Sequence, residues 1–207
     1  MRMRLCAGVL ATTAWLLGAT ALWAQCAPAR PTTAAVASTP AQDALIKAGS
    51  DLHDQGKFDD AIAKYQEVLR QNPANVAALY ELAYSYVGKK DYTQAIATAR
   101  RGAQYASDLL PLFYDEIASA YDASGEPQKA VETYQQGIAL SPKASQLYYN
   151  LAVTYRQSLK QPAAARTALQ QALRIEPMLP SAHLLLGDAY QSSGNVTAAF
   201  LALSTFL

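Results

Sequence analysis

The 207-residue sequence has little of what most catalytic and metal sites are made from. It holds two cysteines and two histidines, too few for a disulfide framework or a cysteine-based zinc site, and they leave little for a histidine-based metal site. It contains no glycine-rich phosphate loop and no HExxH, GxSxG or CxxC motif. We therefore predict that the chain is not an enzyme and has no catalytic residues, metal site or cofactor.

An excess of charge of one sign is also missing. Seventeen Lys and Arg residues stand against sixteen Asp and Glu residues, which gives a formal net charge of +1. Proteins that bind nucleic acid through its phosphates need clustered basic residues. The near-neutral balance argues against nucleic acid as the main partner.

The first residues are almost free of charge. Arg2 and Arg4 precede an uncharged run over residues 5–23 that ends in small side chains. This pattern predicts a secretory signal peptide over residues 1–24, and therefore a periplasmic or secreted protein. The run is just long enough to span a bilayer, so an uncleaved inner-membrane anchor is the alternative. A lipid-modified Cys26 is a third reading, which the preceding glutamine disfavours.

Residues 25–41 are rich in Ala, Pro and Thr and carry one charge, Arg30. They show no apolar periodicity and have few side chains large enough to bury. This composition predicts an extended, disordered linker.

From residue 42 onward the sequence repeats itself. An alanine that follows a turn recurs at spacings of 34, 35, 35 and 34 residues: Ala61, Ala95, Ala130, Ala165 and Ala199. A small residue precedes it by 12 residues, or by 13 in the fourth unit: Gly49, Ala83, Ala118, Ala152 and Gly187. In the first unit Leu45, Ala48, Gly49 and Leu52 have the spacing of one helix face. Each unit is therefore expected to hold two helices that approach closely at small residues.

This pattern resembles the tetratricopeptide repeat (TPR), a helix–turn–helix unit of 34 residues. The resemblance implies an all-α fold, a right-handed superhelical solenoid of five repeats whose first helices line the concave side. The TPR domain would cover residues 42–207, with units at 42–75, 76–110, 111–144, 145–179 and an incomplete 180–207. The second unit departs from the pattern, because Ser107 stands where the repeat usually has proline.

The candidate binding residues are those of the first helices that packing does not use. They are Tyr80, Glu81, Tyr84, Asp115, Glu116, Ser119, Asp122, Tyr149, Asn150 and Arg156. They predict a groove with aromatic platforms and an acidic centre, suited to an extended peptide with basic or proline residues; a solvated face with incidental tyrosines is the alternative. As a surface residue, Asp122 is expected to contribute under about 0.5 kcal/mol to stability. His53 is expected to point to solvent.

The function expected from the repeats is a non-catalytic scaffold that binds a protein or an extended peptide in a bacterial envelope assembly. A self-assembling structural or membrane-tethered subunit is one alternative, and an accessory region of a longer enzyme is another. Near the end of the chain several large apolar side chains crowd one helix: Phe200, Leu203, Phe206 and Leu207. They predict either a homodimer contact or a truncated product, because a solenoid end needs a polar cap.

Overall fold

The computed structural model describes residues 29–192, and within that range the chain is almost entirely helical. Its helices are α2 (Pro40–Asp54), α3 (Phe58–Gln71), α4 (Val76–Gly88), α5 (Tyr92–Gly102), α6 (Leu110–Ala123), α7 (Pro127–Leu140), α8 (Ser145–Gln157), α9 (Pro162–Ile175) and α10 (Pro180–Ser192). Two short strands, β1 (Thr33–Ala34) and β2 (Tyr105–Ala106), pair in parallel. The predicted all-α solenoid is confirmed.

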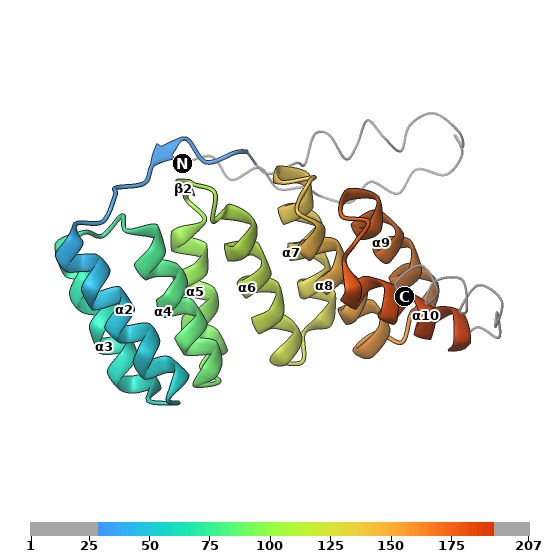
Figure 1. Ribbon diagram of the computed structural model, residues 1–207, viewed down its shortest axis with the longest axis horizontal. Coiled ribbons are helices and arrows are strands. Elements are labelled where there is room, and N and C mark those ends of the chain that lie inside the picture. The colour runs from blue at the N-terminus through green and yellow to red at the C-terminus, as the bar shows by residue number, and fades with distance from the viewer. Residues whose placement is uncertain (1–28, 193–207) are drawn as a thin grey trace, which may run out of the picture.

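The helices form a row of antiparallel pairs, each stacked on the next (Figure 1). The first helices of the pairs, α2, α4, α6 and α8, also touch one another in succession, whereas the second helices make at most marginal contact with each other. The first helices therefore form the tighter, inner layer of the curved row. We call each boundary between successive first helices a seam.

Local signals set the start and end of each helix. Thr39 and Gln42 form a reciprocal capping box at the start of α2, and Asn75 and Asp91 cap α4 and α5 through side-chain oxygens. Within each pair, one residue of the turn takes a positive φ angle: Gly56, Lys90, Gly125 and Lys160. This left-handed residue ends the first helix and lets the chain reverse.

The small residues of the repeat allow close helix packing. Gly49 of α2 lies against the ring of Tyr65 on α3, because a Cβ atom at Gly49 would come within 2.5 Å of that ring. Four of the alanines that recur in the repeat are buried, with at most 1% exposure: Ala61, Ala95, Ala130 and Ala165. The small residues that recur in the sequence therefore lie where the two helices of a unit pack against each other.

The second unit differs where its proline is missing. Helix α5 ends early, at Gly102, and the chain then forms β2 before α6 begins at Leu110. Phe113 of α6 is fully buried, and its ring lies so close to Gly102 that an added Cβ atom would approach it to 2.2 Å. Ser107 thus lies in a longer connection between α5 and α6. Because Gly102 has no side chain, the ring of Phe113 can pack against it.

The prediction of a disordered linker over residues 25–41 is wrong where the structure describes it. Residues 29–39, here called the N-terminal segment, run in extended form along one edge of the row (blue, Figure 1), and α2 already begins at Pro40. The side-chain amide of Asn72 donates hydrogen bonds to the carbonyl oxygens of Val36 and Ala37, each at 3.3 Å. Asn75 donates to the Ser38 hydroxyl at 2.7 Å.

The physical reason lies in the connection between α3 and α4. Asn72 and Asn75 are buried, with 8% and 1% exposure, and buried amides need partners. The N-terminal segment supplies them, and β1 then pairs with β2, aligning Thr33 with Tyr105. Composition alone does not show such partners.

Several expectations lie outside the described residues. They are the signal peptide over residues 1–24, the second helix of the fifth unit and the apolar patch of Phe200, Leu203, Phe206 and Leu207. Between residues 29 and 192, no helix combines the length and the apolar character that crossing a bilayer requires.

Candidate functional site

The inner layer carries exposed apolar side chains. Tyr84 on α4 is 44% exposed, Leu112 on α6 is 36% exposed and Leu184 on α10 is 52% exposed. Each belongs to the first helix of its unit and so to the inner layer. Exposed apolar side chains that gather on one surface are typical of an interaction site, whereas single ones are common on any protein.

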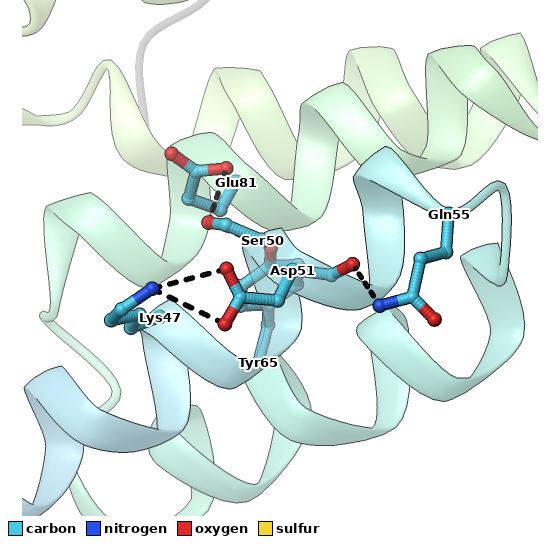
Figure 2. A network of polar contacts seen from close by, with 6 residues as sticks. All are labelled: Lys47, Ser50, Asp51, Gln55, Tyr65 and Glu81. Carbon is cyan, nitrogen blue, oxygen red and sulfur yellow. Dashed lines mark hydrogen bonds and ion pairs between the residues drawn. The ribbon is translucent and has the colours of Figure 1, made fainter.

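The seam between α2 and α4 is closed by polar contacts (Figure 2). The Ser50 hydroxyl donates to a carboxylate oxygen of Glu81 at 3.5 Å and accepts from the Tyr65 hydroxyl at 3.4 Å. Half-burial between the helices raises the pKa of Glu81, and the hydrogen bond from Ser50 opposes that rise. Glu81, which the sequence places in the expected groove, therefore also helps to join α2 to α4.

Aromatic rings run along the inner layer from α2 to α6. His53 stacks on Tyr84 with ring centroids 4.6 Å apart, and the rings of Tyr84 and Tyr80 are parallel at 6.4 Å. Tyr80 meets Phe113 edge-on at 6.2 Å. His53 also contacts the Ser85 hydroxyl through Nδ1 at 2.9 Å. The expectation that His53 points to solvent is therefore wrong, because Tyr84 and Ser85 hold it on the inner layer.

The seam between α6 and α8 is closed by two hydrogen bonds to carboxylates. The Asn150 amide donates to Asp115 at 2.6 Å, and the Thr154 hydroxyl donates to Asp122 at 2.9 Å. A polar hollow of about 370 Å³ lies beside them, also lined by Ser119 and Val153. Asp122 is only partly exposed and its second oxygen is buried without a partner, so its description as a plain surface residue is wrong.

The seam between α4 and α6 differs from its neighbours. No hydrogen bond or ion pair joins these two fully described helices. Glu116 lies in this seam with only 8% exposure and has no hydrogen-bond partner. Burial, together with the negative charges of Asp115 and Glu81, raises the pKa of Glu116 to about 7. Burial next to the same carboxylates raises the pKa of Tyr80 to about 12.

The remaining candidate residues also make contacts within the protein. Arg156 forms an ion pair with Asp188 of α10 at 3.1 Å, and the Ser119 hydroxyl lies 3.1 Å from that of Tyr134. Tyr149 is half-buried and packs against the core around α8. The structure thus brings the ten candidates onto one layer but uses most of them between helices, leaving Tyr84 as the exposed one.

The sequence did not single out His53, Leu112 or Thr154 as parts of this surface. The repeat register was the available signal, because these residues fall on the first helices that carry the other candidates. Among residues 29–192, no three or more His, Cys, Asp or Glu side chains are placed to hold a metal ion.

Family models identify the repeat directly. Three models described as the tetratricopeptide repeat or TPR repeat match residues 46–108, 114–144 and 158–194. The chain is a tetratricopeptide repeat protein. TPR proteins bind protein partners, and the fold of this chain is consistent with a protein-interaction scaffold.

Solved structures show the same fold. A crystal structure of MamA is 26% identical, with a TM-score of 0.61 over 76% of this chain and 91% of that one. The pilF protein of Pseudomonas aeruginosa is 20% identical, with a TM-score of 0.67 over 80% of this chain and 75% of that one. A thermophilic TPR protein of Thermus thermophilus is 21% identical, with a TM-score of 0.63 over 80% and 90%. No curated protein sequence matches the chain.

Proposed function

We propose that this TPR protein is an exported, non-catalytic scaffold that holds an extended protein segment along its inner layer, within a bacterial envelope assembly. One observation carries the binding surface: Tyr84, Leu112 and Leu184 project from first helices into solvent. Burying such side chains against a partner releases free energy that the isolated chain does not gain. Export rests on the leader sequence alone.

The inner layer suits an extended segment better than a compact domain. Tyr84, Leu112 and Leu184 lie on α4, α6 and α10, so a single partner has to cross several repeats to reach all three. The polar hollow between α6 and α8 lies on this path. Aromatic residues are frequent among the side chains that dominate binding energy, so Tyr84 is the expected main contact.

Affinity capture of the full-length protein from cells tests the binding surface. We expect the combined Tyr84→Ala and Leu184→Ala variant to lose a captured partner by at least about tenfold, since each removed side chain contributes on the order of 1 kcal/mol or more. Met178→Ala is the matched control, because Met178 is 75% exposed but lies on a connection between helices. Loss of the partner in the control, or its retention in the double variant, would contradict the proposed surface.

Cell fractionation with N-terminal sequencing tests export. We expect the protein in the periplasm or medium, with a mature N-terminus at Leu22 or Gln25. Retention of Met1 in the membrane fraction would replace this with the membrane-anchored alternative.

A further inference from the structure

The α4–α6 seam holds an energetically costly arrangement. Glu116 is more than nine-tenths buried and makes no hydrogen bond or ion pair. Buried carboxylates are normally paired or hydrogen-bonded, because a bare buried charge loses its hydration without replacement. Its carboxylate oxygens are not fully enclosed, in contrast to Oδ1 of Asp122, so they touch solvent and are open to a positive group or a donor from outside the chain.

The groups that surround Glu116 favour a positive group. From α4 it is faced by Tyr80 and Glu81, on α6 by Asp115 and from α7 by Tyr134, all of which interact with it electrostatically. None of these groups is cationic. The one basic group that acts on Glu81 is His53, and the described lysines and arginines that form ion pairs do so elsewhere.

We propose that the α4–α6 seam is an anchor site for one basic side chain, Lys or Arg, of the bound segment; this inference rests on the scaffold function proposed above. The positive head group lies at Glu116, supported by Glu81 and Asp115. Its aliphatic stem passes Tyr80 and the exposed ring of Tyr84. A peptide side chain fits this site because it enters from the groove that Tyr84 borders.

The aromatic rings favour the same ligand chemistry. Tyr80 and Tyr84 present parallel rings beside the carboxylates, and such rings attract ammonium and guanidinium groups through their negative faces. Methylene groups of Lys or Arg also bury well against aromatic carbon. Anionic and neutral side chains do not gain the attraction to the ring faces.

The anchor makes binding depend on pH. The pKa of free Glu116 is raised to about 7, so its carboxylate is mostly protonated at pH 5.5 and mostly ionised at pH 8. A cation binds the ionised form better, so binding lowers this pKa and releases a proton. Affinity for a basic segment should therefore rise with pH across this range.

The test selects peptides from a random linear library on the full-length protein at pH 8. We expect the recovered peptides to share one Lys or Arg position. Replacing that residue with citrulline or norleucine should weaken binding to the unmodified protein by at least about tenfold, as expected for loss of a paired charge. The same replacement should have less than about a twofold effect on the Glu116→Gln variant, because the two changes remove the same contact.

The pH dependence and a charge-matched variant complete the test. From pH 8 to pH 5.5 the unmodified protein should lose at least about tenfold in affinity for a recovered peptide, while Glu116→Gln should not. Glu132→Gln, on the exposed face of α7, changes the net charge equally and should behave like the unmodified protein.

The outcomes separate the anchor from the scaffold function. Recovered peptides without a fixed basic residue, or bound equally well by Glu116→Gln, overturn the anchor; if Tyr84→Ala weakens those peptides, the scaffold function stands. Failure to recover any peptide that depends on Tyr84 overturns both.

Discussion

Helix α6 has two seams of opposite character. Toward α8 each of its carboxylates accepts one hydrogen bond, Asp115 from Asn150 and Asp122 from Thr154, and only the second oxygen of Asp122 stays buried without a partner. Toward α4 it presents Glu116 without a hydrogen bond, and the ring of Phe113 meets Tyr80 edge-on. One seam uses its charges to hold repeats together, and the other keeps a charge uncompensated. This difference indicates that the α6–α8 seam stabilises the stack of repeats. The α4–α6 seam is where we expect a group from outside the chain to bind.

The largest expected effect is a gain of stability from Glu116→Gln at high pH. The pKa of Glu116 is about 7 in the folded chain, against an ordinary value of 4.5, so folding favours its protonated form. Its stabilising contribution is complete below about pH 4.5 and is lost as pH rises through 7. At pH 8 the substitution should raise the free energy of unfolding by up to about 3 kcal/mol.

Urea denaturation at pH 8 and pH 5 measures this effect. At pH 5 the gain should be small, since Glu116 is then largely protonated, and Glu132→Gln should change little at either pH. An equal gain at both pH values would mean that Glu116 is not the titrating group.

The opposite result is expected from Asn150→Ala at the closed seam. This change removes the donor to Asp115, a carboxylate whose pKa burial already raises and the Asn150 hydrogen bond lowers. We expect a loss of about 2 kcal/mol at pH 8, typical of a hydrogen bond to a charged group. If denaturation curves show no loss, Asp115 is hydrated and the contrast between the seams disappears.

Gly102→Ala tests the apolar packing between α5 and α6, next to the α4–α6 seam. The new methyl group would meet the ring of Phe113, and overpacking costs about 1–3 kcal/mol, partly offset by the better helix propensity of alanine. We expect a net loss of about 1 kcal/mol in the free energy of unfolding. Gly125→Ala is not a suitable control, since Gly125 has a positive φ; Ala163→Gly, on the exposed side of α9, reports helix propensity alone.

The effect expected of Thr154→Val is as small as that of Gly102→Ala. The substitution keeps the shape of the side chain and removes the hydrogen bond to Asp122, which should cost about 1 kcal/mol. Thermal unfolding alongside Thr167→Val, whose hydroxyl only bonds the carbonyl oxygen of Ala163 within its own helix, separates the seam contact from the valine substitution. Equal changes in the two variants would show that Thr154 does not stabilise the seam.

The sequence was sufficient for the repeat and insufficient for the seams. Spacing predicted the helix pairs because the same small residues are buried in each of the first four units, as Ala61, Ala95, Ala130 and Ala165 are. The bond between Asp115 and Asn150 joins residues 35 positions apart and has no equivalent that repeats with the unit. Unit-specific contacts of this kind leave no period to detect.

The placement of Glu116 illustrates the limit for the site itself. The sequence located it on the first helix of the third unit and included it among groove residues, but only packing shows that it is buried and unpaired while Asp115 beside it is bonded. Likewise, the composition of residues 25–41 indicates disorder, because it carries no information on the buried amides of Asn72 and Asn75 that bind residues 36–38.

The N-terminal segment also decides how the protein would bear a mechanical load. Because β1 pairs with β2 ahead of α6, the described chain begins beside the middle of the row and not at its first helix (Figure 1). A pull on residue 29 would first load the short strand pair, then the contacts of Asn72 with residues 36 and 37, and then the contact of Asn75 with Ser38, before any tension reached α2. In a membrane-tethered chain, these contacts would break before the helices do. The force would then not distort the inner layer.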